Sequence, residues 1–241
     1  MEAKTPQPLP RRLDLHCDAG SEGSGPLIGA RMAAEALGIG FLLIAIVGSG
    51  ILGERLCGGN IAIALLVNAL ATGAALFALI EWFAPLSGAH FNPLVTLVLA
   101  FRGDVKPAIA AAYVPAQILG AIIGVGIAEA MFDERIYALS AHVRSGPSQW
   151  LSEAVSTFGL IGAVWVCSRL RPSAMAGVVA AYIGGAFWFT ATDFANPAVT
   201  IARALTDTFS GIRPLDVPGF IISEIVGAVA AVFVFRRLAP A

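Results

Sequence analysis

The chain has 241 residues, of which 57% are hydrophobic and only 13% are charged, against roughly 25% charged residues in an average soluble domain. Its net charge of −1, without a basic cluster, excludes a nucleic-acid binder that works by neutralising phosphates. The cysteines Cys17, Cys57 and Cys167 lie far apart with no histidine at ligand spacing, so we predict neither a disulfide framework nor a metal site.

The first thirty residues are polar and rich in proline and glycine, with charges of both signs. They lack the apolar stretch and the small-residue cleavage site of a signal peptide. We therefore expect a disordered tail over residues 1–30, followed by one membrane domain over residues 31–238.

Six apolar stretches are long enough to cross a bilayer, which takes about 20 residues. They cover approximately residues 32–52, 60–80, 107–129, 150–168, 173–192 and 218–235. Gly-x-x-x-Gly spacings such as Gly120–Gly124 suit close helix packing in lipid. The sequence therefore predicts an all-α protein that crosses the membrane six times.

The distribution of lysine and arginine predicts the orientation of these spans. With the N-terminus inside, ten of the 15 basic residues fall on the inner side and five on the outer side. This bias predicts that both termini are cytoplasmic.

Two related segments interrupt this pattern, GAHFNPLVTLV at residues 88–98 and DFANPAVTIAR at residues 193–203. Each begins an apolar stretch of about ten residues, 92–101 and 196–205, which is too short to span. Such a stretch can enter the membrane and stop only where it lines a cavity. We therefore predict two re-entrant half-helices.

The Asn-Pro pair suits the beginning of such a half-helix. Pro93 and Pro197 fit the first helical position, which needs no N–H donor. Asn92 and Asn196 can cap the free backbone N–H groups through the side-chain carbonyl, and their NH₂ groups remain able to donate to a solute. Two helix N-termini that face each other also make the midplane electropositive, which opposes cations.

The chain repeats internally. Residues 31–132 and 149–238 each contain a first span with an early glutamate, Glu35 or Glu153, then a second span, an Asn-Pro half-helix and a third span. Because three spans is an odd number, the second half enters the membrane inverted. Inverted repeats place functional sites near the midplane.

The paired Asn-Pro-x-Val-Thr motifs, the 3+3 plan and the two glutamates resemble the aquaporin/aquaglyceroporin (major intrinsic protein) family over roughly residues 30–238. The resemblance implies a homotetramer with one passive pore per subunit and no cofactor. It also implies that Asn92 and Asn196, with their prolines, form the central constriction, and that Glu35 and Glu153 brace the re-entrant loops. The bacterial members it resembles imply a place in the inner membrane.

The sequence departs from the family at the outer filter. Relatives usually carry an arginine three residues after the second Asn, where this chain has Val199, and often an aromatic residue where it has Thr72. Both changes predict a wider and less polar filter. Phe187, Trp188 and Ala191 are the candidates for the filter position contributed by the fifth span.

Three further residues are expected near the pore mouths or loops. Asp193 precedes the second Asn and is expected at the outer mouth, and His90 is expected to brace its loop. Arg203 lies four residues beyond Val199. Its guanidinium could reach back toward the filter, but the favoured expectation is an i, i+4 pair with Asp207 at the wet surface.

These features predict a passive channel for small uncharged solutes: glycerol-like polyols, urea, neutral metalloid hydroxides such as arsenite, and water. A water-selective aquaporin is the alternative, with Arg203 and an aromatic residue rebuilding a narrow filter. An ion-coupled transporter is disfavoured because the midplane offers Asn rather than Asp. No catalytic constellation is present, so we do not predict an enzyme.

Overall fold

The computed structural model describes residues 26–239. Residues 1–25 of the predicted tail lie outside the described residues. The first helix begins at Ile28, so it includes the last three residues of the range predicted for the tail. Leu27 precedes the helix in an extended conformation.

Within residues 26–239, six helices are long and apolar enough to cross a membrane, in agreement with the sequence. The fifth, α6, extends from a short 3-10 turn at Pro172–Ala174 and ends at Phe189, three residues before the predicted end of its span. The six long helices are α1 (Ile28–Leu56), α2 (Ile61–Ser87), α4 (Pro107–Met131), α5 (Pro147–Leu170), α6 (Met175–Phe189) and α8 (Val217–Leu238), the last preceded by a 3-10 turn at Pro214–Asp216.

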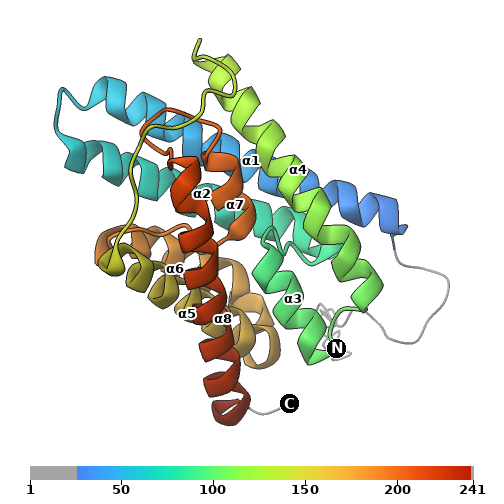
Figure 1. Cartoon of the computed structure of the whole chain (residues 1–241). Coiled ribbons are helices and arrows are strands. Elements are labelled where there is room, and N and C mark those ends of the chain that lie inside the picture. Colours follow the sequence, from blue (N-terminus) through green and yellow to red (C-terminus); the bar gives the residue numbers. More distant parts are fainter. Residues whose placement is uncertain (1–25, 240–241) are drawn as a thin grey trace, which may run out of the picture.

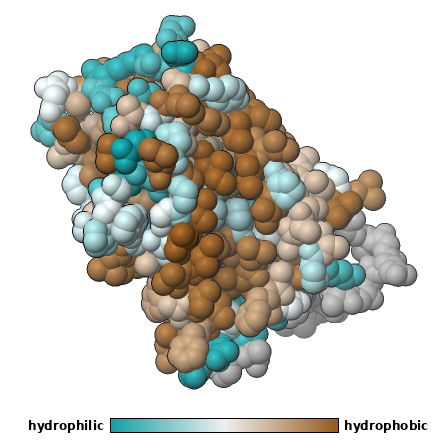
Figure 2. Space-filling view, viewed as in Figure 1, coloured by the Kyte–Doolittle hydropathy of each residue, from teal (hydrophilic) through white to brown (hydrophobic). Residues whose placement is uncertain are grey.

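The outer surface of these helices is apolar. Large hydrophobic side chains such as Leu70, Leu119 and Val229 are more than half exposed. Figure 2 shows hydrophobic residues over the middle of the visible face, with the most hydrophilic residues gathered near its two ends. A lipid bilayer stabilises such a surface, and helices suit it because they satisfy their own backbone hydrogen bonds.

Two short helices lie among the long ones, α3 (Pro93–Arg102) and α7 (Pro197–Arg203) (Figure 1). The prolines are the first helical residues and the asparagines cap them, as the sequence predicts. α7 is shorter than the predicted 196–205, because the N–H groups of Ala204 and Leu205 donate to Ile201 and Ala202 in tight final turns.

The two halves have the same internal arrangement. α1 packs against α2 and α4, and α5 packs against α6 and α8. The half-helices connect the halves, since α7 contacts α4 and α3 contacts α5 and α8. Neither half can therefore be removed without exposing the half-helix of the other.

Glycines allow the closest helix crossings, and the crossings match between the halves. A Cβ on Gly120 or Gly124 of α4 would overlap the backbone of Ala36 or Gly40 in α1. A Cβ on Gly227 of α8 would likewise overlap the backbone of Ala154 in α5. The small residues thus bring whole backbones together where lipid gives little drive for association.

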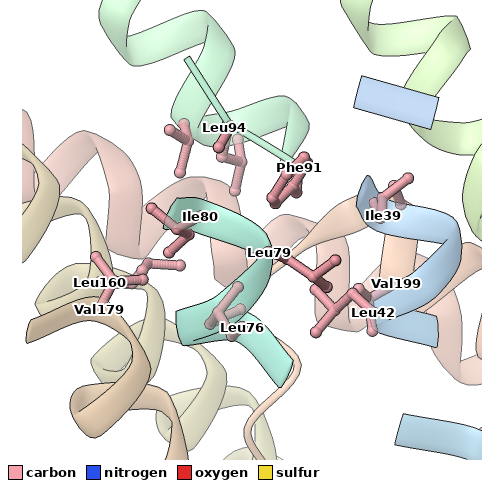
Figure 3. Packing of buried hydrophobic residues seen from close by; sticks show 14 of the residues in the cluster. Ile39, Leu42, Leu76, Leu79, Ile80, Phe91, Leu94, Leu160, Val179 and Val199 are labelled. Atoms are coloured by element: carbon pink, nitrogen blue, oxygen red, sulfur yellow. The ribbon is translucent and has the colours of Figure 1, made fainter. Parts of the chain in front are cut away.

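Apolar side chains from both halves converge between the helices (Figure 3). In this buried cluster Ile80 of α2 lies on the side of Leu160 and Val179, while Leu79 of α2 points toward Leu42 of α1. This cluster surrounds the place where the two half-helices meet.

We expect Gly124→Ala to lower the thermal unfolding midpoint in detergent. The added methyl group must displace the α1 backbone at Gly40, and overpacking of this kind costs about 1–3 kcal/mol. The measurement is thermal unfolding of the purified protein by intrinsic fluorescence.

Gly29→Ala is the matched control, because among residues 26–239 no atom beyond its own stretch of helix lies within 4 Å of its Cβ position. Its unfolding midpoint should stay at that of the wild type. Equal midpoints for the Gly124 variant and the wild type would contradict the close crossing of α1 and α4.

Candidate functional site

The two half-helices meet end to end through reciprocal hydrogen bonds. Asn92 Nδ2 donates to the carbonyl of Ala195 at 2.8 Å, and Asn196 Nδ2 donates to the carbonyl of Phe91 at 2.8 Å. Each amide nitrogen carries two hydrogens. One hydrogen of each asparagine thus joins the halves, and one is left for another acceptor.

The backbone before each asparagine is unusual and makes this meeting possible. Phe91 and Ala195 have φ values of 47° and 49°, in the left-handed region. This conformation is uncommon for residues other than glycine and costs energy unless the surroundings impose it. It turns both carbonyl groups toward the opposite half.

The asparagine side chains also cap their helices, as the sequence predicts. Asn92 Oδ1 accepts from the N–H of Leu94 at 2.9 Å, and Asn196 Oδ1 accepts from the N–H of Ala198 at 3.0 Å. The cap holds the carbonyl oxygen of each amide, so the orientation of its NH₂ group is determined by the helix.

Glu35 holds the first re-entrant loop from within α1. It is fully buried, and its two oxygens accept from the N–H groups of His90 and Phe91, from Ser87 Oγ and from Gln117 Nε2 at 2.6–3.0 Å. A carboxylate with four donors is well compensated for its burial. These bonds keep the strained loop in place.

His90 also holds this loop. Its Nδ1 lies 3.0 Å from Thr96 Oγ1 and its ring packs edge-on against Tyr113. Burial lowers the pKa of His90, so the ring is neutral at neutral pH. The side chain lines the cavity described below, but its polar contact is with α3.

The second loop is held by two carboxyl groups. Glu153 accepts from the N–H groups of Phe194 at 3.1 Å and Ala195 at 2.9 Å. Glu224 of α8 accepts from the N–H of Asn196 at 3.2 Å and from Thr200 Oγ1 at 2.6 Å. The second half therefore has a carboxyl group where the first half has an amide.

That amide is Gln117 of α4, which donates to both Glu35 and Thr96 Oγ1. Neither Gln117 nor Glu224 was expected from the sequence to support a loop. The signal was present: each is a buried polar residue in an apolar span. Its meaning depended on the distant threonine, Thr96 or Thr200, that the side chain contacts.

A cavity of about 1840 Å³ extends along the half-helices. We call its two ends the α3 end, which includes Arg102 and Lys106, and the α7 end, which includes Arg203. Its wall is mainly apolar and includes side chains from α1, α2, α5 and α6. Both Asn92 and Asn196 lie on its wall.

The wall also includes Thr72, Phe187 and Val199, of which Val199 lies between Asn196 and Arg203 in α7. Thr72 Oγ1 has no hydrogen-bond partner within the described part of the chain. None of the three side chains carries a charge, so this section of the cavity is weakly polar.

Trp188 does not line the cavity, and the expectation that placed it there is wrong. Its side chain is 50% exposed on the outer surface of α6. Successive helical residues point about 100° apart, so a helix that turns Phe187 toward the cavity turns Trp188 away.

Arg203 corrects a second expectation. It does not pair with Asp207, which instead accepts from the N–H of Ala141 at 2.8 Å. Its side chain is 5% exposed and its Nε donates to the carbonyl of Ser210. The i, i+4 spacing does not bring Asp207 beside Arg203, because α7 ends at Arg203 and Asp207 lies beyond the helix.

Asp193 lies near Arg203 on the wall of the cavity. One oxygen accepts from Ser156 Oγ, and the other has no partner among residues 26–239. Burial raises the pKa of Asp193 to about 8, so this carboxyl group is mainly protonated at neutral pH.

Comparisons with known proteins agree with this geometry. The family model described as Major intrinsic protein matches residues 26–195. Aquaglyceroporin AqpS of Rhizobium meliloti (strain 1021) is 51% identical over 209 residues, which cover 86% of this chain and 89% of that protein. Human aquaporin-5 is 31% identical over 192 residues, which cover 73% of this chain and 70% of that protein.

The fold has a solved counterpart. The X-ray structure of the aquaglyceroporin from Plasmodium falciparum matches with a TM-score of 0.67 and 20% sequence identity. The match covers 89% of this chain and 98% of that chain. The six spans and two half-helices are therefore a known architecture.

We expect the same Glu→Gln change to have different effects in the two halves. Glu35→Gln replaces an oxygen that accepts two hydrogen bonds, and unsatisfied buried donors cost about 1–3 kcal/mol each. Glu224→Gln keeps the oxygen that accepts from Asn196 and Thr200, and changes the oxygen that has no described partner. Only the first variant should unfold at a clearly lower temperature.

Glu54→Gln on the exposed end of α1 is the control, and it should leave the unfolding midpoint unchanged. The three variants are compared by thermal unfolding in one detergent. Equal losses of stability for Glu35→Gln and Glu224→Gln would contradict the different bonding of the two loops.

Proposed function

The chain belongs to the major intrinsic protein family, and on that premise we propose that it is a passive channel that admits small uncharged solutes larger than water. The family consists of membrane channels for small neutral solutes, not of enzymes. The observation that carries the proposal is the uncharged section of the cavity formed by Thr72 and Val199.

We propose that Asn92 and Asn196, with Pro93 and Pro197, form the central constriction. Each asparagine has one amide hydrogen that is not used between the halves. A solute oxygen that passes the constriction can accept from both. The positive ends of α3 and α7 favour such acceptors and oppose cations there.

The residues that select solutes by size are, in this proposal, Thr72, Val199 and Phe187. The first two are small, and both line the cavity. Glycerol-like polyols, urea and neutral metalloid hydroxides such as arsenite, As(OH)₃, match an opening of this kind. The printed name of the Rhizobium relative, an aquaglyceroporin, supports solutes beyond water.

Glu35, Glu153 and His90 act in this proposal by holding the loops that carry the asparagines. The channel domain comprises residues 31–238, in halves of about 31–132 and 149–238. We propose that it forms a homotetramer in a bacterial inner membrane with both termini cytoplasmic, so that the α7 end faces outward. The excess of basic residues on the other side supports this orientation.

A water-selective channel is the second candidate. The position of Arg203 on the cavity wall favours it, because a guanidinium stacked on the Phe194 ring narrows the α7 end. The two candidates differ in whether glycerol passes.

Stopped-flow light scattering on proteoliposomes tests the proposal. Vesicles with the protein should reswell faster than protein-free vesicles when glycerol, urea or arsenite is the osmolyte. Fast water movement without solute entry would favour the second candidate, and no acceleration for any solute would reject both.

We expect Val199→Arg to reduce glycerol flux more than water flux. The long cationic side chain would enter the uncharged section of the cavity and narrow it for the larger solute. The readout is the ratio of the two permeabilities in proteoliposomes, which should fall by about tenfold if the change costs the larger solute about 1.4 kcal/mol more.

Val143→Arg is the matched control, since Val143 is 60% exposed in the loop between α4 and α5. It adds the same charge away from the cavity and should keep the wild-type ratio. If Val199→Arg also keeps that ratio, Val199 does not select solutes.

A further inference from the structure

We propose that Arg203 is the residue that excludes cations at the α7 end of the channel, one helical turn beyond the uncharged Val199. The inference rests on the proposed channel function and assigns the charge selectivity of its α7 end to one side chain. The solutes that pass are then uncharged molecules with oxygen atoms that can accept hydrogen bonds.

The position of Arg203 in the cavity is the first reason for this proposal. Arg203 follows Val199 by four residues in α7, so the two lie on one face of the helix, about 6 Å apart along its axis. Both line the same cavity. A solute that enters from the α7 end must pass Arg203 before it reaches Val199 and the asparagines.

The second argument is that the guanidinium is held in place. Its central carbon lies 3.5 Å from the centroid of the Phe194 ring, and its Nε donates to the carbonyl of Ser210. Ser210 is itself anchored, because its Oγ donates to the carbonyl of Ile46 in α1 at 3.1 Å. The arginine therefore keeps one orientation although its helix has ended.

The third reason is that several N–H donors of the guanidinium have no protein acceptor among residues 26–239. An arginine offers five N–H donors in a planar fork. Nε uses one, and neither terminal nitrogen donates to a protein acceptor within residues 26–239. Neither is among the fully occluded atoms that lack a partner. These donors are available to the oxygen of a solute in the cavity.

The charges around Arg203 are the fourth reason for this proposal. No carboxylate of the described chain lies within 4.0 Å of Arg203. The carboxyl group of Asp193 is mainly protonated at neutral pH, as described above, and Arg144 adds a second positive charge nearby. Glu153 also acts on both arginines through its charge. An arginine stays protonated in proteins, so two positive charges face the negative charge of Glu153, and the α7 end keeps a net positive charge that repels cations.

Urea and guanidinium provide the test, because they are planar molecules of the same shape that differ in charge. Uptake of each radiolabelled compound at low concentration is measured in proteoliposomes. The wild type should take up urea and exclude guanidinium. In Arg203→Gln, the ratio of guanidinium to urea uptake should rise by about tenfold or more, because an unpaired charge in a low-dielectric passage is a barrier of at least that size.

Two variants control for charge and for the loss of an arginine. Arg203→Lys keeps the charge, so its ratio should stay near that of the wild type. Arg135→Gln removes an exposed arginine from the loop between α4 and α5, away from the cavity, and should also keep the ratio.

A second route leaves Arg203 in place. Val199→Glu puts a carboxylate one turn from the guanidinium, where it can pair with it, and should raise the ratio as Arg203→Gln does. Retained urea uptake shows that a variant is folded. The comparison of urea uptake with guanidinium uptake by the wild type does not depend on any variant.

The outcomes separate the two claims. If the wild type takes up urea no faster than protein-free vesicles, the channel for solutes larger than water is rejected and the inference with it. If the wild type takes up both compounds equally well, or if Arg203→Gln keeps urea uptake and the wild-type ratio, the inference is overturned and the channel function stands.

Discussion

The structure depends on two reciprocal hydrogen bonds, from Asn92 to the carbonyl of Ala195 and from Asn196 to the carbonyl of Phe91. A half-helix that stops inside a membrane leaves its first backbone N–H groups without partners. Each asparagine resolves this with its carbonyl oxygen and uses its NH₂ group to hold the opposite half. The same side chain therefore ends a helix, joins the repeats and retains one donor toward the cavity.

The loops that present these asparagines are strained, and buried carboxyl groups hold them in that state. Phe91 and Ala195 adopt left-handed backbone conformations that would relax if Glu35 and Glu153 did not bind the adjoining N–H groups. The two loops are supported in the same way but by different side chains. Gln117 completes the first support and Glu224 the second, so the second loop contains one more ionisable group near the midplane.

At the α7 end, the positive charge of Arg203 lies one helical turn beyond the uncharged Val199. Val199 leaves the first turn of α7 uncharged, and α7 ends one turn later at Arg203. Because the helix ends there, the following loop folds back and offers the carbonyl of Ser210 and the ring of Phe194 to the guanidinium. A longer helix would have continued toward Asp207, and the arginine would then have been free to pair at the surface.

The sequence by itself determined the six spans, the two half-helices and their caps, because span length, Asn-Pro pairs and an odd number of spans per half are local or countable features. It also indicated Glu35 and Glu153 through their matching places in the repeat. Only the tertiary structure decided that Arg203 lies on the cavity wall, that Trp188 faces outward and that Gln117 and Glu224 support the loops. Those outcomes depend on where a helix ends and on contacts between residues far apart in the chain, and spacing along a helix cannot report either.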